Sequence, residues 1–205
     1  VESFRAGEDI HERTAREIFD IPEDEAVGIS RRSAAKAINF GLIYGMSAFR
    51  LGGDLGIGQK EAKRYIDEYF DRMPTVRDWL EGTKQFARDN GYVETLYGRR
   101  RLLPDIHARQ FNVRGAAERE ATNTPIQGTA ADLIKRAMIA VDDAIADTGA
   151  RLLLQVHDEL LLEVPEAELD HVREVVCAAM VDVAELAVPL VVNTAVGATW
   201  EEAHG

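Results

Sequence analysis

The 205-residue sequence predicts an α+β fold, mostly helical at first and then strand–helix–strand. Over the first half, apolar residues recur at the three- and four-residue spacing of amphipathic helices. Near the end, two apolar runs at residues 152–156 and 160–164 flank the triplet His157-Asp158-Glu159. This second pattern predicts a buried hairpin with polar residues at its tip.

The first two helices have recognisable ends. One is expected over residues 8–19, and the Ile-Pro pair that contains Pro22 ends it, because proline disfavours a helical residue before it. The next is expected over residues 31–44. Ser30 could cap its start, and Gly45 follows its end.

A glycine-rich stretch at residues 52–58 predicts a flexible turn region. Helices are expected over residues 60–72 and 75–89, with Pro74 between them. Residues 92–103 predict a hairpin with three successive arginines after its turn.

Proline is also expected to affect a helix in the second half of the chain. A helix near residues 114–123 should be kinked or interrupted by Pro125, and another follows at 129–147. A helix near residues 166–186 precedes a strand-like apolar segment at 189–192.

Composition indicates a soluble globular protein, with 46% hydrophobic and 29% charged residues. The single Cys177 excludes an internal disulfide and fits a reducing cytoplasm, and the sequence contains no signal peptide or membrane-spanning stretch. The chain begins at Val1 in mid-pattern, so we expect a portion of a longer protein.

Charge is unevenly distributed around a net value of −12. Residues 1–25 carry nine acids against three arginines, and residues 151–205 carry eleven against two. Residues 26–60 carry five cations against one acid, and residues 93–119 carry six against three. A locally basic groove on an acidic body would still bind a phosphate backbone, because salt screens distant charges. Ordinary charge fluctuation is the alternative.

Arg32, Lys36, Phe40 and Tyr44 follow one another at intervals of four residues. Each such step drifts by roughly 40° around a helix, so the four side chains share a stripe about 120° wide. Two cations suit a polyphosphate, and two flat rings suit a base and sugar. The alternative is a surface helix with incidental cations and core aromatics.

Two further groups could carry chemistry. Asp158 and Glu159 offer the hard oxygen ligands that Mg²⁺ prefers, although a solvated turn is the alternative. Arg119, Asn123 and Gln127 are also four apart, so on a continuous helix they could donate to phosphates or minor-groove acceptors. A plain polar helix face is the alternative there.

Residues 32–47, RSAAKAINFGLIYGMS, resemble the motif B helix, or O-helix, of family A DNA polymerases, the bacterial DNA polymerase I group. The resemblance continues in the family's order through TLYGRRR at 95–101, QGTAAD at 127–132 and QVHDE at 155–159. It covers nearly the whole chain.

The resemblance implies the right-hand polymerase architecture. Residues 1–110 would form a helical fingers subdomain, with the motif B helix at about 31–44. Residues 111–205 would form the C-terminal part of an antiparallel-sheet palm, with the motif C hairpin at about 152–164. The thumb and the motif A part of the palm are expected to lie outside this sequence.

The resemblance also implies residue roles. Nucleotide (dNTP) binding falls to His11, Arg32, Lys36, Phe40 and Tyr44. Catalysis falls to Asp158, Glu159 and Lys36, with Asp158 as metal ligand. DNA binding falls to Arg114, Arg119, Asn123, Gln127 and His157, although His157 taken alone fits a hydrogen-bonded structural role better.

The implied activity is template-directed DNA synthesis in replication and repair, by a cytoplasmic, monomeric enzyme that needs no membrane partner. Its partners would be primer–template DNA and dNTPs, and its cofactors two Mg²⁺ ions that share Asp158 with an aspartate outside this sequence. The 205-residue chain alone is therefore expected to be inactive. The alternatives are a single-subunit RNA polymerase, against which Phe40 and residues 119–132 argue, and a non-catalytic binding fragment.

Overall fold

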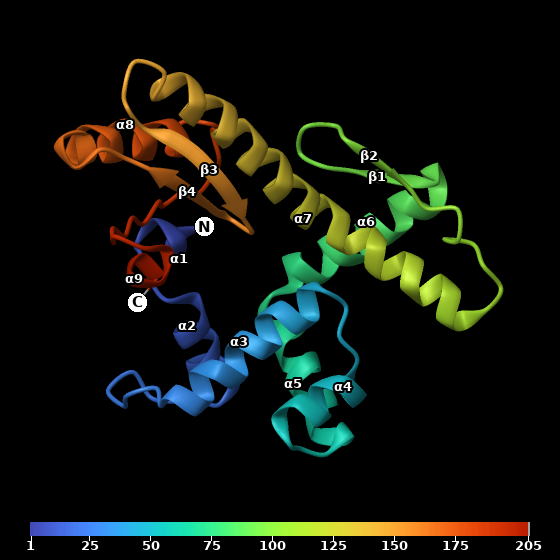
Figure 1. The fold of residues 1–205 in the computed structure, drawn as a ribbon. Helices are drawn as coiled ribbons and strands as arrows, with labels where there is room; N and C mark the ends of the chain where they lie inside the picture. The colour runs from blue at the N-terminus through green and yellow to red at the C-terminus, as the bar shows by residue number, and fades with distance from the viewer. Residues whose placement is uncertain (205) are drawn as a thin grey trace. The chain divides into compact units, whose positions relative to one another are not determined.

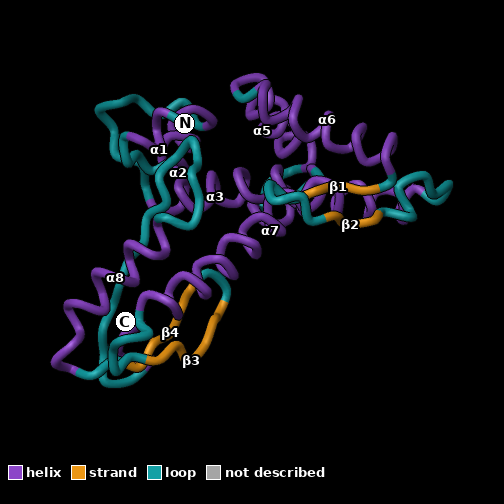
Figure 2. Tube along the Cα trace, turned by 90° about the horizontal axis from the view of Figure 1, so that it is seen from above, coloured by secondary structure: helices purple, strands orange, loops and turns teal. Residues whose placement is uncertain are grey.

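A computed structural model describes residues 1–204, which form two compact units (Figure 1). The N-terminal unit is Glu2–Gly128, and the C-terminal unit starts at Thr129 and includes Val1. The division lies inside one long helix, later in the chain than the predicted subdomain boundary at residue 110. Each sheet has two strands, visible as orange pairs in Figure 2.

Helices build most of the N-terminal unit. They are α1 (Glu2–Arg5), α2 (Ile10–Ile18), α3 (Ile29–Ile43), α4 (Ala48–Leu55), α5 (Gln59–Arg72), α6 (Pro74–Asn90) and the first part of α7 (Phe111–Ala144). The helices predicted near residues 8–19, 60–72 and 75–89 are thus confirmed. The helices α2, α3, α4 and α5 share one apolar core, in which Ile38, Leu51 and Tyr69 are buried.

Helix α3 begins earlier than predicted. Its N-cap is Gly28, whose backbone is extended, so the prediction of Ser30 as cap is wrong and Ser30 lies in the first turn. At the other end, Met46 N–H donates to Gly41 O at 2.7 Å, and Gly45 N–H donates to Leu42 O at 3.1 Å. This Schellman motif requires the positive φ of +75° that Gly45 adopts.

The glycine-rich segment is helical up to Leu55, so the prediction of a turn region from residue 52 is wrong. Ser47 caps α4 by accepting from Arg50 N–H, and Leu51 is fully buried. Gly52 allows close packing, because a Cβ there would lie 2.9 Å from the Ile57 carbonyl oxygen. Tertiary packing has therefore overridden the low helix propensity of glycine.

The predicted hairpin at 92–103 is confirmed as β1 (Tyr92–Glu94) paired antiparallel with β2 (Arg100–Leu102). Of the kink or interruption predicted at Pro125, the interruption does not occur, and α7 continues through this residue. The hydroxyl of Thr124 donates to Glu120 O at 2.7 Å one turn back. Pro125 itself lines an apolar hollow with residues of α6 and β1.

The C-terminal unit places a strand pair and a helix beside the second part of α7. Its elements are β3 (Arg151–Val156), β4 (Glu159–Glu163), a short 3₁₀ helix at Glu166–Glu168, α8 (Leu169–Val181) and α9 (Trp200–His204). Val141, Ile145, Val172 and Val176 form its buried core.

The hairpin of β3 and β4 exists as predicted, but it is not buried. Leu153 and Leu154 are each 51% exposed, because a β-bulge interrupts the register and only one face packs on the core. The helix predicted to residue 186 ends at Val181. Residues 189–192 form no strand in the described structure, since strand propensity without a pairing partner is insufficient.

No helix within residues 1–204 is both long enough and apolar enough to cross a bilayer.

Candidate functional site

Helix α3 presents the predicted stripe on its surface. Arg32, Lys36 and Phe40 are exposed, and Tyr44 is half-buried as the C-cap residue. The opposite face, which includes Ile38, is buried against the core. The stripe is therefore available to a ligand along its whole length.

The aromatic part of the stripe extends onto α2. The rings of Phe40 and Tyr44 stack with centroids 6.2 Å apart and an angle of 18°. The ring of His11 lies 5.4 Å from that of Phe40. The structure thus brings together all five residues predicted to bind the nucleotide, from two helices, within the N-terminal unit.

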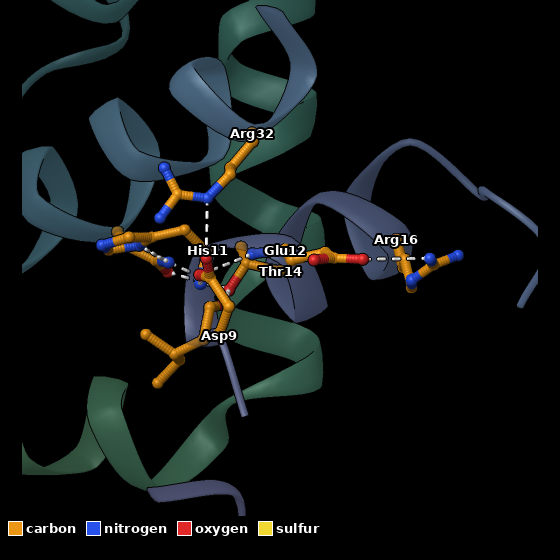
Figure 3. Close-up of polar contacts among 8 residues, drawn as sticks. Asp9, His11, Glu12, Thr14, Arg16 and Arg32 are labelled. Atoms are coloured by element: carbon orange, nitrogen blue, oxygen red, sulfur yellow. Dashed lines mark hydrogen bonds and ion pairs between the residues drawn. The ribbon is translucent and has the colours of Figure 1, made fainter. Parts of the chain in front are cut away.

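Asp9 ties the start of α2 to α3 (Figure 3). Its Oδ1 accepts from the backbone N–H of His11 at 2.9 Å and of Glu12 at 3.2 Å. Its Oδ2 accepts from Arg32 Nε at 2.7 Å, and this hydrogen bond is the main cause that lowers the pKa of Asp9. The side chain of Arg32 makes no other hydrogen bond within residues 1–204, so both terminal nitrogens can donate to an incoming anion.

His11 is held by two buried residues that sequence reasoning missed. Asn39 Nδ2 lies 3.0 Å from His11 Nδ1 and 3.0 Å from Thr14 Oγ1. Burial is the main cause that lowers the pKa of His11, and the charges of Arg32 and Lys36 act in the same direction, while Asp9 opposes them. The only signal for Asn39 in the sequence is its position next to Phe40.

Helix α7 carries the predicted DNA-binding face. Because α7 is continuous through Pro125, Arg119, Asn123 and Gln127 do lie on one face of it. Arg119 and Gln127 are exposed, and Asn123 Oδ1 is buried with no hydrogen-bond partner among the described residues. The stem of Arg119 packs at the end of α3, with Cγ 3.1 Å from where a Cβ on Gly45 would lie.

Other cations near α7 are already engaged within the N-terminal unit. Arg114 donates to Ala108 O at 3.2 Å and lies 4.0 Å from Glu118. Among the three successive arginines, Arg100 pairs with Glu94 and Arg101 with Glu120. Each of these ion pairs and hydrogen bonds uses only part of a guanidinium, which has five N–H donors in all.

In the C-terminal unit, the turn between β3 and β4 exposes His157, Asp158 and Glu159. His157 has a φ of +55°, which is uncommon for a residue other than glycine and costs about 1–2 kcal/mol. Gln155 steadies the turn by donating its side-chain amide to the His157 carbonyl. Such local strain is a common feature of functional sites.

Residues 1–204 contain no cluster of three or more His, Cys, Asp or Glu side chains placed to hold a metal ion. The two exposed carboxylates of this turn still fit Mg²⁺, which takes one or two protein carboxylates and completes its shell with phosphates and water. They do not fit a closed structural site, which needs four protein ligands.

Comparison with known proteins identifies the family. The profile of the family described as "DNA polymerase family A" matches residues 1–202. The chain belongs to DNA polymerase family A. DNA polymerase I of Pseudomonas aeruginosa is 52% identical over 206 residues, which cover 100% of this chain and 22% of that protein. The thermostable DNA polymerase I of Thermus aquaticus is 50% identical over 197 residues, which cover 96% of this chain and 24% of that protein.

A solved polymerase structure has a matching fold. It is the polymerase domain of Pol1 from M. smegmatis, in complex with DNA primer-template and dNTP, with a TM-score of 0.94 and 46% identity. The match covers 100% of this chain and 36% of that one. The chain spans about a quarter of the length of the curated family A relatives that it matches.

Proposed function

We propose that the protein is a DNA-directed DNA polymerase, which transfers a nucleotide from a dNTP to the 3′-hydroxyl of a primer and releases pyrophosphate. The observation that carries this proposal is the exposed stripe on α3, with two cations ahead of two stacked rings. Membership of DNA polymerase family A supports it. The related Pol1 domain, solved with primer-template DNA and dNTP, supports the same partners here.

The α3 stripe would bind the incoming nucleotide in a fixed direction. Arg32, at the start of the stripe, and His11, which reaches it from α2, contact the outer phosphates, since both side chains can donate hydrogen bonds. Lys36 also contacts the phosphates and gives a proton to the leaving pyrophosphate. Phe40 borders the sugar and base, and Tyr44 stacks near the nascent base pair.

The α7 face would hold the primer–template duplex. Arg119, Asn123 and Gln127 donate to minor-groove acceptors, which are present in every correct base pair, and Arg114 supplies a phosphate contact. His157 would lie near the primer terminus.

Asp158 would bind Mg²⁺, and Glu159 would support it beside the same turn. Two such ions, when bound, activate the primer hydroxyl and neutralise charge on the transferred phosphate. A second aspartate is needed for this, and we propose that it comes from a motif A segment outside this sequence. The 205-residue chain on its own is accordingly inactive.

A single-subunit RNA polymerase is the weaker alternative, because the matched relatives are DNA polymerases. We further propose that the intact protein is a cytoplasmic monomer that acts in DNA replication and repair.

Primer extension by the intact protein tests the proposal, with dNTPs compared against rNTPs. Asp158→Asn is expected to lower the rate by at least about 10³-fold without loss of DNA binding, because metal stabilisation of the transition state is worth several kcal/mol. Asp170→Asn is the matched control, since its side chain is 98% exposed on α8. Preferred use of rNTPs, or full activity of Asp158→Asn, would refute the proposal.

Lys36→Ala separates binding from chemistry at the α3 stripe. It is expected to slow the single-turnover rate and weaken dNTP binding, whereas Lys60→Ala, which removes an exposed lysine from α5, leaves both unchanged. A Lys36→Ala enzyme that extends primers at the parent rate would remove Lys36 from the mechanism.

A further inference from the structure

Asn39 lies on the buried side of α3, only 7% exposed, while its neighbour Phe40 faces outward. Its amide reaches α2 at two points, His11 Nδ1 and Thr14 Oγ1. This link joins α3 to α2, and Figure 3 shows the two residues that it reaches, His11 and Thr14. A polar group at such a buried position is costly unless it is hydrogen-bonded.

Thr14 determines which way the Asn39 amide points. The hydroxyl of Thr14 has one proton, and two acceptors lie near it, Ile10 O at 2.8 Å and Asn39 Oδ1 at 3.2 Å. We assign the proton to the nearer Ile10 O, which leaves Oγ1 as the acceptor towards Asn39. The group facing it is therefore the amide nitrogen, Nδ2, at 3.0 Å. The second proton of Nδ2 is then directed to His11 Nδ1.

This hydrogen bond determines the tautomer of the His11 ring. A ring whose Nδ1 accepts a hydrogen bond is neutral and carries its own proton on Nε2. The charged groups that face the ring are Asp9 at the start of α2, and Arg32 and Lys36 on α3. Burial and the two cations lower the pKa of His11, which agrees with a neutral ring near pH 7.

We infer that Asn39 is a positioning residue, which holds His11 in the Nε2–H tautomer so that the ring donates one hydrogen bond to the phosphates of the incoming nucleotide. The inference rests on the proposed nucleotide-binding function of the α3 stripe. Asn39 acts through His11 and does not itself touch the nucleotide.

Single-turnover extension by the intact protein, with the dNTP concentration varied, measures the affinity for the nucleotide. Asn39→Leu removes the donor at similar volume. It is expected to weaken dNTP binding about fivefold, which corresponds to one net hydrogen bond of about 1 kcal/mol. In a His11→Ala background the same substitution should have no further effect on affinity.

Asn39→Asp gives a second readout. A carboxylate at this position accepts a hydrogen bond from Nδ1–H and favours the charged ring, so the affinity for dNTP should vary with pH between about 6 and about 8. That pH dependence should disappear when His11→Ala is added. Ile38→Val is the structural control, because it loosens the buried side of α3 and should lower the melting temperature alone.

The outcomes distinguish the phosphate role of His11 from the positioning role of Asn39. If His11→Ala binds dNTP as the parent does, the phosphate role proposed for His11 is wrong, and Asn39 loses its function with it. If His11→Ala weakens binding but Asn39→Leu does not, only the positioning role is overturned. The positioning role is also overturned if Asn39→Leu weakens binding equally with and without His11, or if Ile38→Val weakens it as much.

Discussion

Gly45→Ala should separate backbone strain from a contact that positions Arg119. Gly45 has a φ of +75°, where a residue with a Cβ costs about 1–2 kcal/mol. The new Cβ would also lie 3.1 Å from Arg119 Cγ and 3.6 Å from Cδ. Because that contact is tighter than ordinary van der Waals packing, the arginine stem has to shift by a few tenths of an ångström.

Gly91→Ala is the matched control. Gly91 also has a φ of +75° at the end of a helix, and beyond its chain neighbours no heavy atom lies within 4 Å of where a Cβ would be. Both variants should therefore lose about 1–2 kcal/mol of stability. Only Gly45→Ala should weaken primer–template binding, by about two- to fivefold, if a shifted Arg119 loses part of one charged hydrogen bond.

Thermal unfolding measures the first effect, and fluorescence anisotropy with labelled primer–template at fixed salt measures the second. Adding Arg119→Ala to each variant should abolish the difference in DNA affinity between them. Equal loss of DNA affinity in Gly45→Ala and Gly91→Ala would show that Arg119 is not positioned through Gly45, since strain alone would then account for the loss.

Three further predictions concern the contacts around α2. Asp9→Ala should destabilise the start of α2 by about 1 kcal/mol, whereas Asp9→Asn keeps the N-cap and should lose less, as measured by hydrogen exchange of the His11 and Glu12 amides. The free energy of unfolding should fall as the pH drops below about 6.5, because the lowered pKa of His11 means that the unfolded chain takes up the proton first. The lowered pKa of Asp9 should add a second loss of stability below about 3.8. Calorimetry at a series of pH values should show that His11→Gln lacks the first loss. Arg16→Ala should lower the free energy of unfolding by about 2 kcal/mol, because the Arg16 guanidinium donates to Pro22 O at 2.6 Å and Glu25 O at 2.8 Å. The control Arg50→Ala, which removes an exposed ion pair, should lower it by less than about 1 kcal/mol. Equal melting temperatures of the two variants would contradict this ranking.

Local sequence patterns predicted the helices well where the pattern and the packing agreed. Of the two outcomes predicted at Pro125, a kink or an interruption, the interruption did not occur. The patterns failed at the glycines of α4, where buried neighbours outweigh intrinsic propensity. They also failed at residues 189–192, because a strand depends on a hydrogen-bonding partner that an apolar run cannot specify.

The candidate nucleotide site also combines features that a local pattern predicts with contacts that no local pattern predicts. The spacing from Arg32 to Tyr44 lies within one helix, so helical geometry alone placed those side chains on one stripe. The partners of the stripe lie far away in the sequence. Asp9 is 23 residues from Arg32, and Asn39 is 28 residues from His11.

By itself, then, the sequence determined the family, the order of most helices and hairpins, and the residues that share a helix face or a turn. These depend on the short-range geometry of the backbone. Only the tertiary structure decided that Asp9 holds Arg32, that Asn39 and Thr14 orient His11, and that Gly45 makes room for Arg119. Those contacts form because packed helices bring distant side chains within hydrogen-bond or van der Waals distance, and no local pattern encodes which pairs will meet.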